Sequence, residues 1–197
     1  MSVSASTDIL LMVQTRDGDP ATFAVLVERH RNGLVGYLYR MVENHAVAEE
    51  LAQETFLRAF RSRAGYQPSA KFTTWLYSIG TRLALNWLRD NRLSRRHEPL
   101  DAPGENGRPY QYADPRPLAD SRLMRQDLVR TVRRALAELP DRQRSVVLMH
   151  KYQDMSYEEI AAALGVTVQA VKSLLFRAHS ALRQKLGRRI RPRTASL

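Results

Sequence analysis

Apolar residues recur at steps of three and four along most of the chain, and no window alternates apolar and polar residues as a half-buried strand would. This period is typical of amphipathic helices that bury one face. The pattern is interrupted by a Ser-rich start of seven residues, a Pro-rich segment near the middle and a basic C-terminal end. We therefore predict an all-α protein made of two small helical domains joined by a flexible linker.

Three helices are expected in the first domain. The first begins after the N-cap Asp19, with Pro20 at the first helical position, where a missing N–H costs nothing. The second spans about 45–63 and the third about 72–92, and the loop between them contains Gly and Pro. Their apolar stripes supply the candidate core: Phe23, Leu26, Val27, His30, Leu34, Leu38, Met41, Val47, Leu51, Ala52, Phe56, Ala59, Phe60, Phe72, Trp75, Leu76, Ile79, Leu83 and Trp87.

A polar stripe follows the opposite side of the third helix. It has no acidic residue before Asp90, and we expect it to be exposed and basic. Its members are Thr74, Ser78, Arg82 and Arg89, with Asn86 at the edge.

The most informative local pattern lies near the C-terminus. Helices are expected up to Pro140 and over about 141–152, and Ser156 and Glu159 then form a capping box that opens a short helix. Gly165 supplies a tight turn, and Thr167 can cap the longer helix that follows. A short helix, a turn containing Gly and a longer helix are typical of a helix-turn-helix, whose second helix enters the major groove of DNA.

The second helix of this motif has a buried and a free side. Val171, Leu175, Ala178 and Leu182 are spaced to anchor it. The residues on or near the free side are Gln169, Lys172, Ser173, Phe176 and Arg177. Lys and Arg pair with guanine edges or phosphates, and Gln pairs with adenine. The alternative is a small helical bundle whose basic face is only solvated.

Charge divides the chain further. Thirty-one Lys and Arg against 20 Asp and Glu give a net charge of +11, which predicts a polyanionic partner. Residues 1–95 carry a net +3, residues 96–120 a net −2 and residues 121–197 a net +10. We predict a helical domain over 8–95, a flexible linker over 96–120, a helix-turn-helix domain over 121–187 and a basic tail over 188–197. The surplus thus lies with the motif expected to bind DNA.

Several classes of function lack their sequence signature. The chain has no cysteine, so a thiolate nucleophile, an iron–sulfur cluster and Cys-ligated zinc are excluded. The five His are scattered, and neither a His-Glu-x-x-His motif nor a P-loop occurs. We expect no cofactor, no metal site and no enzymatic activity. The N-terminus has no basic residues followed by a long apolar run, as a signal peptide would, and no apolar stretch in the sequence is long enough to span a membrane. We therefore expect a cytoplasmic protein without stable membrane insertion.

Two segments resemble extracytoplasmic-function sigma factors, the group IV specificity subunits of bacterial RNA polymerase. AEELAQETFLRAF and FTTWLYSIGTRLALNWLRDNR resemble sigma region two. LPDRQRSVVLMHKYQDMSYEEIAAALGVTVQAVKSLLFRAHSALRQKL resembles region four. The resemblance covers nearly the whole chain, and it implies an initiation factor that binds core polymerase, recognises a two-part promoter and helps to melt it.

The resemblance also implies roles for individual residues. Glu50, Gln53 and Glu54 fall where the family docks on the clamp of the largest polymerase subunit, whereas the simpler interpretation is that Glu49 and Glu50 complement the dipole of their own helix. The minus-ten element would be met by Tyr66, Lys71, Arg82, Asn86 and Arg89. The minus-thirty-five element would be met by Thr167, Gln169, Lys172, Ser173, Phe176 and Arg177.

Further partners implied by the resemblance are the flap of the second polymerase subunit, promoter DNA and an anti-sigma factor. Leu174 departs from the family, which often carries arginine there. Arg142 and Arg144 are candidates to hold the DNA backbone, the alternative for each being a merely solvated position. Trp75, Tyr77 and Trp87 are interpreted as packing residues. The alternative function is a stand-alone helix-turn-helix regulator whose N-terminal domain senses a ligand or dimerises.

Overall fold

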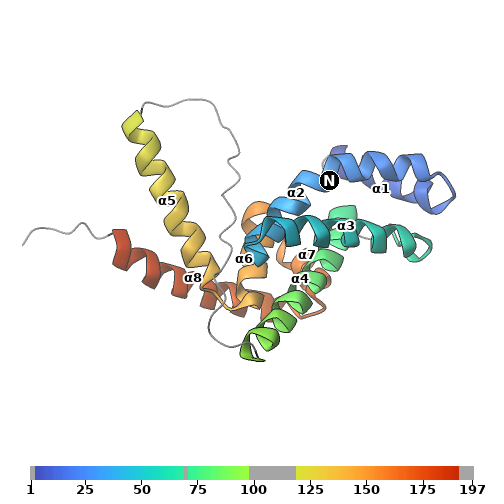
Figure 1. Cartoon of the computed structure of the whole chain (residues 1–197). Helices are drawn as coiled ribbons and strands as arrows, with labels where there is room; N and C mark the ends of the chain where they lie inside the picture. The colour runs from blue at the N-terminus through green and yellow to red at the C-terminus, as the bar shows by residue number, and fades with distance from the viewer. Residues whose placement is uncertain (1–2, 69–70, 98–118, 191–197) are drawn as a thin grey trace, which may run out of the picture.

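The structure is a computed structural model that describes residues 3–68, 71–97 and 119–190. Those residues form helices and no strand, which confirms the all-α prediction (Figure 1). The elements are α1 (Val3–Arg16), α2 (Pro20–Val42), α3 (His45–Arg61), the 3-10 turn η1 (Arg63–Gly65), α4 (Phe72–His97), α5 (Ala119–Ala137), α6 (Asp141–Tyr152), α7 (Tyr157–Leu164) and α8 (Val168–Ile190).

Helix α1 is not among the three helices predicted for the first domain, and α4 ends later than predicted. Residues 3–7 were expected to be loose, but they form the first turns of α1. α1 packs on α2, where Met12 is fully buried and Asp8 is only 3% exposed. The Asp8 carboxylate accepts a hydrogen bond from Arg29 (2.5 Å) and lies 2.8 Å from His30 Nε2. Helix α4 continues to residue 97 and α5 begins at residue 119, both inside the predicted linker. Residues 98–118 of that linker and residues 191–197 of the predicted tail lie outside the described residues.

Helices α2, α3 and α4 enclose a shared core. Asp19 caps α2 by accepting the Ala21 N–H, as predicted. A Cβ built at Gly80 of α4 would lie 3.2 Å from a Leu34 methyl and 3.3 Å from the Thr55 hydroxyl, so this glycine lets three helices approach closely.

The predicted helix-turn-helix is confirmed in its local geometry. Ser156 and Glu159 form both hydrogen bonds of the capping box, and Gly165 is left-handed at φ 66°. The Thr167 hydroxyl accepts the Ala170 N–H at 3.2 Å. Helices α7 and α8 meet at 103°, within the range typical of this motif.

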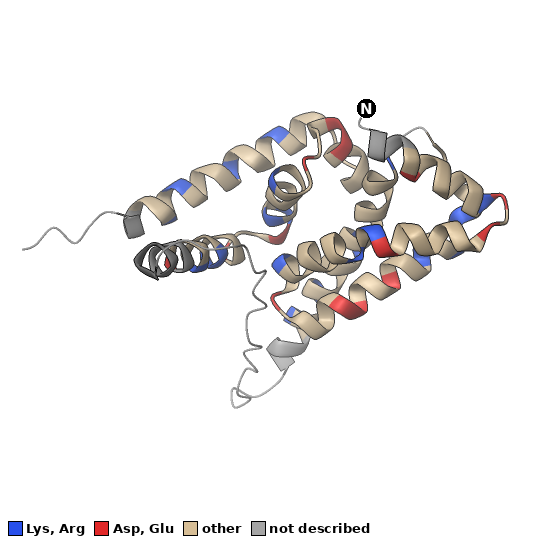
Figure 2. Ribbon diagram, turned by 90° about the horizontal axis from the view of Figure 1, so that it is seen from above, with Lys and Arg blue, Asp and Glu red and all other residues tan. Residues whose placement is uncertain are grey.

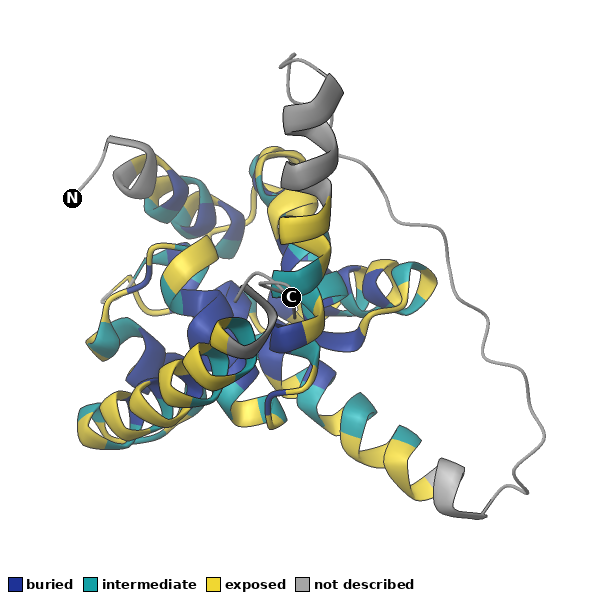
Figure 3. Ribbon diagram, turned by 90° about the vertical axis from the view of Figure 1, so that its left-hand side faces the viewer, coloured by how far each residue is buried: buried dark blue, intermediate teal, exposed yellow. Residues whose placement is uncertain are grey.

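The C-terminal helices α5–α8 pack directly against the N-terminal helices α1–α4. α7 and α6 lie on α4, and α6 also contacts α2. The buried residues of both groups gather where the helices cross (Figure 3). The predicted helices thus form one continuous core.

Arg144 of α6 holds the two groups together. It was predicted as a contact to the DNA backbone, but the structure buries it, with 6% of its surface exposed. Its guanidinium donates to the Met41 carbonyl (2.6 Å) and to the carbonyls of Ala137 and Leu139. Burial lowers the pKa of Arg144 below its usual value. The DNA-contact prediction for Arg144 is therefore wrong in this arrangement, because the residue is buried and its two terminal nitrogens donate to carbonyls of α2 and of the α5–α6 turn.

Replacing the capping serine tests the local origin of α7. Ser156→Ala removes the acceptor for the Glu159 N–H, and we expect a loss of about 1 kcal/mol in the free energy of unfolding, measured by urea denaturation. Ser180→Ala, at an exposed position of α8, is the control and should change stability little. Equal stabilities of the two variants would contradict the assignment of the cap.

Candidate nucleic-acid and protein interfaces

The predicted contact residues of α8 share one exposed face. Thr167, Gln169, Lys172, Ser173, Phe176 and Arg177 are all exposed, whereas Val171, Leu175 and Ala178 are buried. Phe176 is 75% exposed, so its ring is available to a partner. Lys and Arg residues follow one another along the same helix (Figure 2). We call these six residues the α8 face.

Leu174 and Arg142, the two other residues of this domain considered for DNA binding, are placed differently. Leu174, which departs from the family pattern, is partly buried and packs against the core. Arg142 is exposed at the start of α6 and is accessible to DNA, whereas Arg144 is buried. The structure thus gives the leucine a packing role.

The predicted minus-ten residues fall into two groups. Arg82, Asn86 and Arg89 are exposed along α4. Lys71 precedes α4, and its ammonium lies 2.9 Å from the carboxylate of Glu159 on α7. Tyr66 is buried, with 2% of its surface exposed. Tyr66 is therefore covered, whereas Lys71 keeps 40% of its side chain exposed and is engaged only through its ammonium.

The first half of the predicted polar stripe on α4 is also buried, which corrects the expectation that it is exposed. Thr74 is 4% exposed and Ser78 is 6% exposed. The Ser78 hydroxyl donates to the Trp75 carbonyl at 2.7 Å, whereas the Thr74 hydroxyl has no hydrogen-bond partner among the described residues. The sequence indicated polarity, but it could not show that another helix would cover these residues.

An aromatic cluster surrounds Tyr66. Its ring centre lies 5.1 Å from that of Trp75, which in turn lies 6.2 Å from that of Phe72. Trp75 and Trp87 are partly buried against the core and Tyr77 is buried, which agrees with the packing interpretation. Burial, with a smaller contribution from the Asp8 charge, raises the pKa of Tyr66 to about 12.

A groove of about 1150 Å³ lies between α2 and α3, and it contains two of the three residues predicted to meet polymerase. Glu50 and Gln53 line it, whereas Glu54 does not and instead accepts a 2.6 Å hydrogen bond from Arg58. The apolar lining is Phe23, Val27, Val35, Phe56, Leu57 and Phe60; the charged lining is Glu28, Arg31, Glu49 and Glu50. We call this the α2–α3 groove.

Leu57 is a groove residue that the sequence prediction missed. It is 42% exposed and lies outside the core stripe of α3. An apolar residue on the otherwise polar side of the helix is the sequence signal that could have identified it. Such a residue offers apolar contact area to a partner beside an acidic rim.

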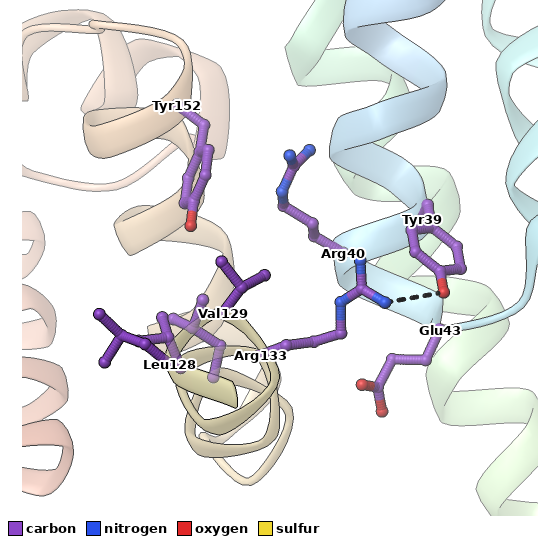
Figure 4. A pocket seen from close by; sticks show the side chains of 9 residues that line it. Tyr39, Arg40, Glu43, Leu128, Val129, Arg133 and Tyr152 are labelled. Atoms are coloured by element: carbon purple, nitrogen blue, oxygen red, sulfur yellow. Dashed lines mark hydrogen bonds between the residues drawn. The ribbon is translucent and has the colours of Figure 1, made fainter. Parts of the chain in front are cut away.

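A second pocket, of about 400 Å³, lies where α5 and α6 approach α2 (Figure 4). Arg133 donates to the Tyr39 hydroxyl at 3.3 Å, and the Arg40 guanidinium lies 4.5 Å from the centre of the Tyr152 ring. Leu128 and Val129 form its exposed apolar side. No sequence pattern pointed to this pocket, since its walls are far apart in the chain.

Across the described ranges, no group of three or more His, Asp or Glu side chains is placed to hold a metal ion. In the same ranges no single helix is long and apolar enough to cross a membrane, although the bent pair α7 and α8 meets the length and composition test together.

Comparison with known proteins gives two family matches in order along the chain. Residues 26–94 match the model of sigma-70 region 2, and residues 130–182 match that of sigma-70 region 4. The sigma factor SigW of Bacillus subtilis is 30% identical over 174 residues, which is 88% of this chain and 93% of SigW. CarQ of Myxococcus xanthus, an RNA polymerase sigma factor, is 36% identical over 176 residues, covering 89% of this chain and 95% of CarQ.

Two solved structures share the fold. CnrH, in complex with the cytosolic domain of CnrY, matches 92% of this chain and 98% of its own at a TM-score of 0.67 and 24% identity. RpoE of Bartonella quintana, in complex with the anti-sigma factor NepR, matches 84% of this chain and 96% of its own at a TM-score of 0.66 and 20% identity.

The buried tyrosines allow a test of the geometry around Tyr66. Its hydroxyl has no hydrogen-bond partner among the described residues, so Tyr66→Phe should be neutral or raise the free energy of unfolding by about 1 kcal/mol at pH 7. The matched control is Tyr37→Phe, whose hydroxyl lies 2.8 Å from that of Thr81 and whose loss should destabilise by about 1 kcal/mol.

The same residue predicts a pH dependence. Because the folded pKa of Tyr66 is raised from about 10 to about 12, the unfolded tyrosine ionises first. Its contribution to stability is therefore complete below pH 10 and is lost as the pH rises toward 12. The stability of Tyr66→Phe should fall less than that of the wild type across this window, and parallel curves would contradict the assignment.

Proposed function

The chain belongs to the extracytoplasmic-function sigma factors, and on this premise we propose that three of its surfaces divide the work of promoter recognition. As a sigma factor it directs RNA polymerase to promoters for transcription initiation. The order of the two family matches is the observation that carries this conclusion. A stand-alone regulator with a helix-turn-helix is not favoured, because it leaves the region 2 match unexplained.

The proposed domains follow the sequence prediction. The region 2 match lies within residues 8–95, and the region 4 match lies within residues 121–187. We propose that the first domain binds core polymerase and the minus-ten element, and that the second binds the minus-thirty-five element. A linker over 96–120 would let the two domains reach sites that are apart on the promoter.

The α8 face is proposed to read the minus-thirty-five element in the major groove. Thr167 caps the second helix of the motif, and the other five residues are exposed on its N-terminal half, which is the part that enters the groove in this class of protein. Lys172 and Arg177 supply contacts to guanine or phosphate, and Gln169 supplies a contact to adenine.

The exposed side of α4 is proposed to contact the minus-ten element. Arg82, Asn86 and Arg89 are accessible and combine two cations with an amide, which suits phosphates and unpaired base edges. Melting requires unstacked bases to be held, at a cost of a few kcal/mol per base that contacts must offset. Tyr66 belongs to this proposal only after the region around it opens, whereas Lys71 is partly exposed and needs only to leave its ion pair with Glu159.

The α2–α3 groove is proposed to dock on the clamp of the largest polymerase subunit. Its apolar lining offers buried contact area, and Glu49, Glu50 and Glu28 form a mainly acidic rim that suits a basic partner. Gln53 adds a neutral hydrogen-bonding group in the same groove. Glu54 lies beside this surface, so we assign it a peripheral contact.

Other partners are proposed from the family. These are the flap of the second polymerase subunit for the region 4 domain, and an anti-sigma factor. The solved complex of the sigma factor RpoE with the anti-sigma factor NepR illustrates the second kind of partner. We propose a cytoplasmic binding protein that carries out no covalent chemistry itself.

Run-off transcription tests the function. Purified protein with core polymerase and a promoter library should yield transcripts that require the protein, and their absence would refute the proposal.

Lys172→Ala or Arg177→Ala should weaken recognition of the upstream element by about 1–3 kcal/mol if the contact is to bases, or lower the salt dependence if it is to phosphate. Arg183→Ala, an exposed cation outside the α8 face, is the control.

Polymerase binding tests the groove. The double variant Glu50→Ala/Gln53→Ala should weaken binding to core enzyme by about 1–3 kcal/mol, measured by fluorescence anisotropy, because it removes polar contacts beside the apolar lining. Glu158→Ala, which removes an exposed acid from α7, is the control for net charge. If both proteins bind alike, the acidic side chains merely complement their own helix dipole.

A further inference from the structure

The pocket of Figure 4 is separate from the three surfaces proposed for promoter and polymerase binding. Helix α2 forms one wall, and α5 and the end of α6 form the other. The lining residues that the structure describes include none from the α8 face, from the exposed side of α4 or from the α2–α3 groove. Its volume of about 400 Å³ is less than half that of the groove and is typical of small-molecule sites. The pocket therefore has the size of a ligand site and takes no part in the functions proposed above.

The wall that α5 contributes is apolar and partly exposed to water. Leu128 is 51% exposed and Val129 is 56% exposed, and both lie at the edge of the pocket. Val132 and Leu136 continue the stripe of Leu128 at steps of four residues and extend it toward the core. A ligand with an apolar body would remove this wall from water, which is the main favourable contribution to binding apolar groups.

Two arginines reach the pocket from different helices. Arg40 extends from α2, and its guanidinium lies 4.5 Å from the centre of the Tyr152 ring (Figure 4). Arg133 extends from α5 and donates to the Tyr39 hydroxyl at 3.3 Å. Arg40 also donates to the Gly36 carbonyl at 2.7 Å, and in the described part of the chain neither arginine forms an ion pair with a carboxylate. Because a guanidinium has five N–H donors, both keep donors for a ligand.

The charge of the lining favours one class of anion. Arg40 and Arg133 are cations and Glu43 is an acid, so the lining carries one positive charge in excess. A carboxylate carries one negative charge, whereas a phosphate monoester carries about 1.5 to 2 at pH 7. The planar donors of arginine also match the two oxygens of a carboxylate.

We propose that the pocket between α2, α5 and α6 binds a small amphipathic carboxylate, whose head group pairs with Arg40 and Arg133 and whose apolar body covers the α5 wall. Helix α2 lies mostly within the region 2 match, and the wall residues from Val132 onward lie within the region 4 match. The ligand thus contacts both regions at once and acts on the protein without a second protein.

Calorimetric titration of the full-length protein tests the class of ligand. Octanoate is the probe, and octanamide, which has the same chain and a neutral head group, is the control. Octanoate should bind at a single saturable site, and octanamide should bind about tenfold more weakly, as expected for loss of a hydrogen bond to a charged group. Equal affinities of the two compounds, or tighter binding of octyl phosphate than of octanoate, would overturn the proposal.

Charge variants test the position of the site. Arg40→Gln and Arg133→Gln each remove one cation and should weaken octanoate binding about tenfold while leaving octanamide binding unchanged. Arg134→Gln makes the same charge change at the neighbouring, exposed position of α5 outside the pocket and is the matched control. If Arg134→Gln weakens binding equally, the net charge of the chain attracts octanoate and the pocket is not its site.

Val129→Glu keeps the test decisive if loss of either arginine alters the fold. Val129 is half-exposed, so the substitution leaves the core intact and sets a carboxylate against the head group of octanoate. Saturating octanoate should raise the Tm of the wild type but not that of Val129→Glu, because a ligand that binds only the folded state stabilises it.

An unchanged Tm of the wild type, or an equal rise in Val129→Glu, would refute the site. Run-off transcription separates this failure from that of the proposed function, since a protein that supports transcription but does not bind octanoate refutes only the carboxylate site.

Discussion

The arrangement of this protein depends on one buried cation. Arg144 donates to carbonyl groups at the ends of α2 and α5 and just beyond, which are groups that a helix leaves unpaired and partially negative. A guanidinium can satisfy several carbonyls at once because its donors form a rigid fork. By joining Met41 to the α5–α6 turn, it fixes α6 against α2 and thereby determines where α7 lies on α4.

This constraint explains why the candidate surfaces differ in accessibility. The α2–α3 groove lies away from the contact between the domains and is open to a polymerase partner. The α8 face is open as well, whereas the start of α4 is covered. The proposed function uses all three surfaces, so the covered start of α4 is where a partner has to contribute binding energy.

Much of the fold followed from local sequence. Asp19 with Pro20, the Ser156–Glu159 capping box and the left-handed Gly165 are interactions within a few residues, and each is found as predicted. The free side of α8 was also predictable, because helical periodicity alone separates Lys172 and Arg177 from Val171 and Leu175. The resemblance of two segments to sigma regions indicated the family, which the family matches confirm.

The sequence by itself determined helices α2 to α8, the caps at Asp19 and Ser156, the exposed face of α8, the exposed second half of the polar stripe on α4 and the family. Tertiary structure alone decided that Arg144 is a buried link and no DNA contact, that Thr74 and Ser78 are covered, and that Glu54 lies outside the groove of Glu50 and Gln53. The physical reason is range: caps and periodicity are set by neighbours along one helix, whereas burial of a polar face depends on a second helix brought from far along the chain.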